Sequence, residues 1–262
     1  MFKRFMYFYA RLISNHVNRL LDLLLPPICA FCSLLTHTSR AICEPCMREL
    51  PILAHHCPQC AQVLPETELI CGQCLKQSPP FEQTFAIFSY EAPIIQLIRG
   101  LKFSHQLPYA SLLADLFLQR IKKDWYKNLP LPQIIIPVPL HPTRLIERGF
   151  NQSIEIARPI SQALGIKLDL VGVKRIKPTL AQSGLSKADR RTNLKHAFQV
   201  EHDYSGQFVV IIDDVFTTGY TVHALAQALR KAGASKIHVW CAARRMRVLP
   251  KSGRQATIAH HL

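Results

Sequence analysis

The sequence has 262 residues, 48% of them hydrophobic, which is enough for one large domain with its own core and a smaller one beside it. This composition excludes an intrinsically disordered chain. Lys and Arg number 32 against 17 Asp and Glu, so the formal net charge is +15. Such a charge favours a partner or substrate that carries phosphate groups, and a soluble basic protein without such a partner is the alternative.

Residues 1–25 are predicted to form an amphipathic helix, with aromatic and aliphatic side chains on one side and basic ones on another, ended by Pro26 and Pro27. Charged residues recur through this stretch, so it is too polar to span a bilayer and does not have the pattern of a signal peptide. We therefore expect a cytoplasmic protein whose thiols stay reduced. The helix either packs on the main body or docks on a membrane surface or a partner.

An internal repeat follows over residues 26–77, where C-x-x-C pairs begin at Cys29, Cys43, Cys57 and Cys71, each fourteen positions after the last. Zinc prefers thiolate ligands and takes four of them in structural sites, so two pairs supply one closed site. The eight cysteines therefore predict two structural zinc ions in a double zinc ribbon. An iron–sulfur cluster also accepts four thiolates, but hairpin-length spacers favour zinc. Disulfides fit a reducing compartment poorly, and four regularly spaced pairs exceed what redox chemistry needs.

The zinc ligands can be paired in two ways. The sequential pairing puts one ion on Cys29, Cys32, Cys43 and Cys46 and the other on Cys57, Cys60, Cys71 and Cys74. A cross-braced pairing joins the first pair to the third and the second to the fourth, and spacing alone permits both. His55 and His56 adjoin Cys57 and are expected at the surface rather than as ligands. Cys241, alone after a predicted strand, is expected to be a buried core residue.

After a polar, proline-containing joint at residues 77–80, residues 81–245 alternate between helical and strand-like patterns. Helices are predicted at 92–102, 111–123, 153–164 and 222–231, and strands at 134–138, 168–173, 208–212 and 236–240. Pro159 is expected to kink the third of these helices or to start a new turn. Alternating strands and helices predict an α/β domain with a parallel sheet flanked by helices. Residues 246–262 form a basic tail without periodicity.

The most informative segment is an apolar strand that ends in Asp213 and Asp214 and is followed by a turn into a helix. In an open α/β sheet, ligands bind at the carboxyl ends of the strands. Helix N–H groups, the positive helix end and threonine hydroxyls form a phosphate cradle there, from Thr217, Thr218, Gly219, Tyr220 and Thr221. The two carboxylates would repel phosphate unless they bind ribose hydroxyls or magnesium. This combination predicts a sugar-phosphate site.

This segment resembles the signature with which type I phosphoribosyltransferases bind phosphoribosyl pyrophosphate (PRPP). The resemblance implies the fold of those enzymes, ribose hydroxyls on Asp213 and Asp214, the 5′-phosphate on residues 217–221, and magnesium bound with PRPP. Tyr220 departs from the pattern, because the family's loop usually carries a small residue at that place.

Further segments resemble the ComF/GntX family closely. They are residues 138–141, residues 148–152, and residues 182–186 with Arg190 and Arg191, together with the cysteine repeat at the front of the chain. The resemblance covers nearly all of the chain between Pro26 and Arg244.

The resemblance also assigns roles around the sugar-phosphate site. The loop after the strand at 134–138 would bind pyrophosphate through Pro139, Leu140 and His141, with Arg144 nearby. The side chains implied to take part in catalysis are Lys102, Arg148 and Arg190. Residues 174–195 stand where related transferases have a lid that closes over PRPP, and a solvated run of charges is the alternative.

ComF proteins are implicated in bringing single-stranded DNA across the inner membrane during natural transformation. The resemblance therefore implies a protein that binds PRPP or another phosphorylated ribose and assists DNA uptake into the cytoplasm. Its implied partners are single-stranded DNA, a competence helicase and a membrane channel, with peripheral contact to the inner face of the inner membrane through residues 1–25. The alternative is an active magnesium-dependent phosphoribosyltransferase of nucleotide or salvage metabolism. A purely structural zinc adaptor leaves Asp213 and Asp214 without a purpose.

Overall fold

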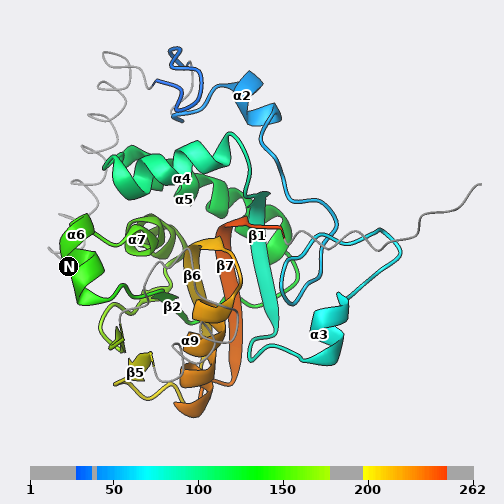
Figure 1. Ribbon diagram of the computed structural model, residues 1–262, viewed down its shortest axis with the longest axis vertical. Coiled ribbons are helices and arrows are strands. Elements are labelled where there is room, and N and C mark those ends of the chain that lie inside the picture. The colour runs from blue at the N-terminus through cyan, green and yellow to red at the C-terminus, as the bar shows by residue number, and fades with distance from the viewer. Residues whose placement is uncertain (1–27, 37–39, 178–196, 247–262) are drawn as a thin grey trace, which may run out of the picture.

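A five-stranded parallel sheet in the order β1-β7-β6-β2-β3 forms the centre of the computed structural model, which describes residues 28–36, 40–177 and 197–246 (Figure 1). The strands are β1 Gln83–Ser89, β2 Ile134–Pro137, β3 Lys167–Leu168, β6 Phe208–Phe216 and β7 Lys236–Arg244. The two longest, β6 and β7, are neighbours inside the sheet and are buried along almost their whole length, as expected for strands covered on both faces. The α/β class predicted from the sequence is confirmed.

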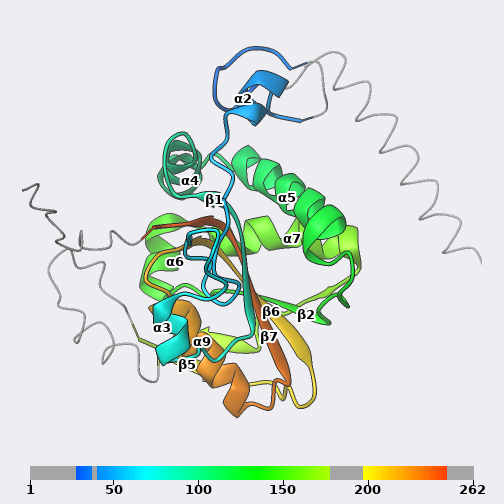
Figure 2. The ribbon, with the colours of Figure 1, turned by 90° about the vertical axis from the view of Figure 1, so that its right-hand side faces the viewer.

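Helices cover both faces of this sheet (Figure 2). One face carries α4 Ile94–Phe103, α5 Pro108–Arg120 and α7 Gln152–Leu164, and a short π-helix, Ile121–Trp125, continues α5. The other face carries α9 Tyr220–Lys231. Alternate residues of β6 enter different cores, with Val210 and Ile212 packed toward α4, α5 and α7 and Val209 and Ile211 packed toward α9.

The cysteine module joins the sheet at its β1 edge. Its two short helices, α2 Glu44–Arg48 and α3 Gly72–Lys76, each begin directly after a cysteine. The segment between them runs beside β1, where the Leu53 N–H donates to the Ile87 carbonyl at 2.9 Å and the Ser89 N–H donates to the Pro51 carbonyl at 2.8 Å. Figure 1 shows α2 beside α4, at one end of β1, and α3 near the other end. The module is therefore built onto the sheet rather than tethered beside it.

A small antiparallel hairpin stands at the opposite edge, formed by β4 Val173–Arg175 and β5 Phe198–Val200. The buried carboxylate of Asp169 holds its base, because it accepts the Gly172 N–H at 2.8 Å and the Tyr204 hydroxyl at 2.9 Å. These donors lower the pKa of Asp169, although burial opposes its charge. Residues 178–196, which include most of the predicted lid, lie between the two strands and outside the described residues.

Several elements differ from the sequence predictions. The strand predicted at 168–173 is wrong, because the chain turns around Asp169 and forms β3 and β4 instead of one strand. Pro159 lies inside α7, and the helix is continuous from Gln152 to Leu164. Strand β1, hairpin strand β5 and helix α6 Pro142–Arg148 were not predicted. The predicted helix at 1–25 and the tail from residue 247 lie outside the described residues, and no helix among the described residues is long and apolar enough to cross a bilayer.

Candidate functional site

The two adjacent carboxylates lie near the carboxyl end of β6, which continues two residues beyond them to Phe216. Successive side chains of a strand point to opposite faces, so Asp214 turns toward α4 and Asp213 does not. Asp214 is only 3% exposed and forms an ion pair with the Lys102 ammonium of α4. Burial opposes the charge of Lys102, but the charges of Asp214 and Asp213 raise its pKa above the ordinary value. The neighbouring carboxylates therefore favour the charged form of Lys102.

Asp213 is the more accessible of the two carboxylates. Its Oδ1 accepts the Ser153 hydroxyl at 3.2 Å and the Asp214 N–H at 3.0 Å. Burial and the neighbouring Asp214 charge raise its pKa to about 7, although Lys102 acts in the opposite direction. Near neutral pH this group can therefore change between a hydrogen-bond donor and a pure acceptor.

Two arginines complete a cationic rim around these carboxylates. The Arg148 Nη1 donates to Gln152 Oε1 at 2.6 Å, and its guanidinium lies over the Phe103 ring at 5.5 Å. Burial lowers the pKa of Arg148, while the charge of Asp214 opposes that shift. Burial likewise lowers the pKa of Arg175 in β4, and the charge of Asp213 opposes that shift. The excess of positive groups suits an anionic ligand.

The turn after β6 forms a tight connection into α9. Gly219 has φ +81°, and a Cβ there would lie 2.6 Å from the Phe216 ring, so both conformation and space require glycine. Thr217 and Thr218 are exposed, and α9 begins at Tyr220. A helix leaves its first N–H groups without intrahelical acceptors and has a positive dipole end. Residues 217–221, named here the phosphate loop, therefore offer a phosphate cradle next to the carboxylates.

The end of β2 is fixed against the same edge of the sheet. The Val138 N–H donates to the Ile212 carbonyl at 3.0 Å, and the Asn151 side-chain amide donates to the Val138 carbonyl at 3.0 Å. Asn151 also caps α7, because its Oδ1 accepts the Ser153 N–H at 2.9 Å. Residues 138–141 and the start of α7 therefore lie beside Asp213.

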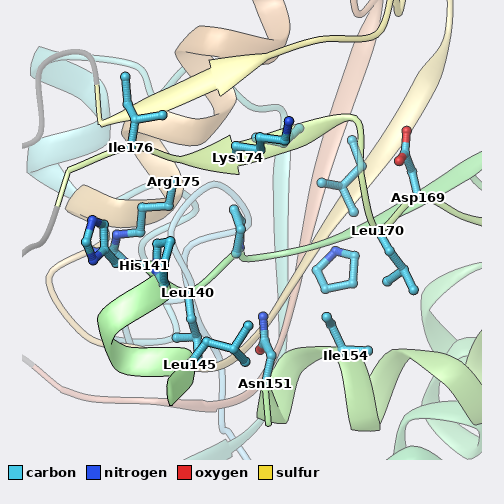
Figure 3. Close-up of a pocket in the computed structure, with 15 residues that line it drawn as sticks. Leu140, His141, Leu145, Asn151, Ile154, Asp169, Leu170, Lys174, Arg175 and Ile176 are labelled. Carbon is cyan, nitrogen blue, oxygen red and sulfur yellow. The ribbon is translucent and has the colours of Figure 1, made fainter. Parts of the chain in front are cut away.

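A cavity of about 410 Å³ opens between this loop, α6, α7 and hairpin strand β4 (Figure 3). Its walls are mostly apolar, with Leu145 from α6 and Ile154 from α7 on one side and Ile176 after β4 on the other. Asn151, His141 and Arg175 supply polar groups at its border. This mixture of apolar walls and a few polar groups is typical of a small-molecule pocket.

The eight cysteines of the module form two separate groups, Cys29, Cys32, Cys43 and Cys46 in one and Cys57, Cys60, Cys71 and Cys74 in the other. Within each group the four sulfurs lie within 4.8 Å of one another. The Cys60 and Cys71 sulfurs are 3.5 Å apart, and the Cys32 and Cys43 sulfurs are 3.7 Å apart. In a tetrahedral site with zinc–sulfur bonds of about 2.3 Å, two sulfurs lie roughly 3.8 Å apart, so both distances are close to that value. The residues fit two zinc ions in the sequential pairing, and the cross-braced pairing is excluded.

Comparisons with known proteins agree with both halves of this architecture. Residues 20–75 match the double zinc ribbon domain, and residues 151–253 match the phosphoribosyl transferase domain. The DNA utilization protein YhgH of Salmonella typhi is 37% identical over 224 residues, which are 85% of this chain and 99% of that protein. Competence protein F of Haemophilus influenzae is 35% identical over 206 residues, which are 77% of this chain and 84% of that protein.

The chain belongs to the ComF family. A solved purine phosphoribosyltransferase from Pyrococcus horikoshii is 23% identical, with a TM-score of 0.33 over 53% of this chain and 77% of that one.

Most residues predicted for the site of this ComF-family chain lie together. Asp213, Asp214, Lys102 and Arg148 meet at the carboxyl end of β6, and the phosphate loop follows directly. Pro139, Leu140 and His141 line the neighbouring cavity. Arg144 of α6 lies close enough to Arg148 and Arg175 to oppose their charges. Arg190 lies outside the described residues.

Three residues near the candidate site were not singled out from the sequence, although one of them, Arg175, falls within the predicted lid at 174–195. Ser153 contacts Asp213, Arg175 lies near Asp213, and Arg244 contacts the main chain of the phosphate loop. Ser153 stands next to the Arg148–Gln152 segment, so that motif could have drawn attention to it. Arg175 and Arg244 come from distant strands, and no local pattern distinguishes them from other basic residues.

The other cysteine-related predictions agree with the structure. Cys241 is fully buried in the middle of β7, as predicted. His55 is exposed and His56 half-buried, and neither is among the clustered metal-ligand candidates. The ring of His55 instead contacts the Glu68 carbonyl at 2.6 Å.

Proposed function

We propose that this ComF-family protein binds PRPP or another phosphorylated ribose at the carboxyl end of β6. The phosphate loop receives the 5′-phosphate, and Asp213 accepts hydrogen bonds from the ribose hydroxyls. The observation that carries this proposal is that the half-buried Asp213 lies near the end of β6 and the phosphate loop begins four residues later, at Thr217. Carboxylates suit sugar hydroxyls, and a helix N-terminus suits phosphate.

Magnesium is proposed to enter with PRPP. It prefers oxygen ligands, keeps several waters and binds chiefly to substrate phosphates with one or two carboxylates. Asp213 and Asp214 are the carboxylates near the carboxyl end of β6, and Asp213 is the one that is not paired with Lys102. When bound, the ion would neutralise pyrophosphate charge, and Lys102, Arg148 and Arg144 would share that task from the protein side.

Calorimetric titration with PRPP and magnesium tests this binding. The double variant Asp213→Ala with Asp214→Ala should lose PRPP affinity, because it removes both carboxylates. Asp213→Asn is the milder variant, because it leaves the Lys102–Asp214 pair intact. Asp203→Asn is the matched control, since Asp203 is an exposed aspartate bonded to Ser205. Undiminished PRPP affinity in both site variants would overturn the assignment.

We propose further that this site serves DNA uptake in the cytoplasm, at the inner face of the inner membrane, with single-stranded DNA as a partner. Two observations support this proposal: the net charge of +15 and the similarity to a relative named competence protein F. If three or four phosphates are contacted, affinity for a single-stranded oligonucleotide should fall about 20- to 50-fold between 50 and 200 mM salt. A flat salt response would remove the electrostatic basis of this proposal.

A second candidate function is phosphoribosyl transfer, which the cavity between α6, α7 and β4 favours because it could hold an acceptor next to Asp213. In this reaction the bond between the anomeric carbon and pyrophosphate breaks, and a nitrogen of the acceptor forms the new bond. The protein would position the reactants and neutralise the leaving charge. Pyrophosphate release from PRPP that requires an added nucleobase would support transfer, and release that no base accelerates would count against it.

A further inference from the structure

Arg244 is the last residue of β7, and its side chain is fully buried between the phosphate loop and the second cysteine cluster. It stands opposite Phe216 in the register of β6 and β7 and opposite Ser89 in that of β1 and β7. This position places a guanidinium under the exit of β6, where the phosphate loop begins.

One end of this guanidinium holds the phosphate loop. The Arg244 Nη1 lies 2.9 Å from the Phe216 carbonyl and 2.7 Å from the Arg245 carbonyl, and it also donates to the Thr217 carbonyl. The guanidinium further lies over the Phe216 ring at 4.8 Å. Phe216 is the ring against which Gly219 turns, so Arg244 supports both sides of the bend.

The other end holds the metal module. The Arg244 Nε donates to the Cys60 carbonyl at 2.8 Å, and Cys60 belongs to the second cysteine cluster. The turn between Cys57 and Cys60 is fixed to β1 as well, because the Thr84 N–H donates to the Pro58 carbonyl at 2.8 Å and the Thr84 hydroxyl donates to the Gln59 carbonyl at 2.7 Å. A cavity of about 180 Å³ lies between α3 and the start of α9, and both Cys60 and Phe216, which Arg244 joins, line it.

Burying the Arg244 guanidinium costs free energy, so this bridge depends on the positions of its hydrogen-bond acceptors. A buried charge is tolerated only when its N–H groups have well-placed acceptors. Among those acceptors are main-chain carbonyls of Cys60, Phe216 and Thr217, from two segments far apart in sequence. A shift of the Cys57–Cys60 turn therefore moves an acceptor of Arg244, and Arg244 in turn determines where the loop carbonyls lie.

We propose that Arg244 is a positioning residue that couples the second cysteine cluster to the phosphate loop, so that metal bound in that cluster and phosphorylated ribose bound at the loop stabilise one another. This inference rests on the proposed function of the loop. Four thiolates fixed on one ion hold the Cys57–Cys60 turn in place, and the turn gives Arg244 its Nε acceptor. Coupling between two binding sites is reciprocal, so bound sugar phosphate must also raise the affinity of the second cysteine cluster for its metal.

The first cysteine cluster provides an internal control. Cys29, a member of that cluster, packs with Ile42 and Leu50 into the core on the α4 and α5 side of the sheet. The carbonyl that Arg244 binds belongs to the second cluster. Only metal in the second cluster should therefore respond to a ligand at the phosphate loop.

The experiment measures zinc release from the full-length zinc-loaded protein to a colorimetric chelator, with and without saturating ribose 5-phosphate and without added magnesium. Cys32→Ser removes the first cluster, so the remaining release phase reports the second. Ribose 5-phosphate should slow that phase at least about fivefold, the low end of typical coupling between sites, and leave the first cluster's phase unchanged. Calorimetry on the same samples measures ribose 5-phosphate affinity.

Arg244→Lys should abolish this slowing and weaken ribose 5-phosphate binding by a similar factor, because one ammonium cannot replace the forked contacts. Arg230→Lys is the matched control, since Arg230 also binds main-chain carbonyls, those of Pro80, Ala234 and Ser235, but at the far end of α9. It should keep the slowing.

The outcomes separate the coupling from the proposed function. If wild-type protein binds ribose 5-phosphate but its second release phase is unaffected, the coupling is wrong and the loop's function stands. If wild-type protein binds neither ribose 5-phosphate nor PRPP with magnesium, the proposed function fails and the coupling fails with it. If it binds only PRPP with magnesium, that ligand replaces ribose 5-phosphate in the release assay. The wild-type measurement decides both even if Arg244→Lys does not fold.

Discussion

Lys102 of α4 and Asp214 of β6 form an ion pair with side chains that are 21% and 4% exposed. This pair joins the first helix of the α/β domain to the strand that carries the candidate site. Because Asp214 is committed to Lys102, Asp213 is the carboxylate that remains accessible to a ligand. The pair therefore gives Asp214 a structural contact and leaves Asp213 as the candidate ligand-binding carboxylate.

Removing Lys102 should cost stability. Lys102→Met leaves the Asp214 charge buried without its partner, so the free energy of unfolding should fall by about 3 kcal/mol in urea unfolding. Adding Asp214→Asn to the variant removes that charge and should recover part of the loss. Lys174→Met is the control, because its pair with Glu201 is exposed and should contribute less than about 1 kcal/mol. Equal losses in both lysine variants would contradict the role given to the buried pair.

Asp213 should make stability depend on pH. Burial raises its pKa from 3.8 to about 7, so between these values the unfolded state releases this proton while the folded state keeps it. The contribution to stability is therefore fully present below about pH 4 and is lost as the pH rises through 7. Asp213→Asn removes it, so wild type should lose stability relative to this variant from pH 5 to pH 8. Parallel curves for the two proteins would show that the Asp213 pKa is not raised.

Gly219 should be required for the phosphate loop. In Gly219→Ala the new Cβ meets the Phe216 ring at 2.6 Å and the backbone must hold φ +81°, so PRPP affinity should fall about tenfold or more and stability by about 1–3 kcal/mol. Gly165→Ala is the matched control, because Gly165 has φ +67° but open space around it. Its variant should lose some stability and keep PRPP affinity. Loss of affinity in both variants would indicate general destabilisation.

The zinc content should follow the two clusters. Elemental analysis of the wild-type protein should find two zinc ions per chain, and Cys29→Ser should lower the content by about one, because a closed site needs all four ligands. Cys241→Ser should retain both ions, since Cys241 lies in β7 and in neither cluster. Metal-free wild-type protein would end the zinc assignment.

Local patterns were sufficient where a segment's own residues determine its structure. The strand-like patterns at 208–212 and 236–240 predicted β6 and β7, and the acidic pair with the threonine and glycine turn pointed to the edge of the sheet where the candidate site lies. The repeat of cysteine pairs predicted two clusters for the same reason. In each case the spacing of residues that are close in the sequence determines the strand, the turn or the cluster that they form.

Contacts between distant segments were not predictable. Strands β3 and β4 are separated because Asp169 binds the N–H groups of the chain around it and the Tyr204 hydroxyl 35 residues later. Ser153 approaches Asp213 across 60 positions, and Arg244 reaches Cys60 across 184. These contacts depend on how β6 and β7 lie between the two cores, which no local spacing encodes.

The most direct test of the sugar-phosphate site is a crystal structure of the protein with PRPP and magnesium. We expect the 5′-phosphate within hydrogen-bond distance of the main-chain N–H groups of residues 217–221, and the ribose hydroxyls on Asp213. A phosphate loop without ligand at saturating PRPP, or PRPP bound at another place, would contradict the account.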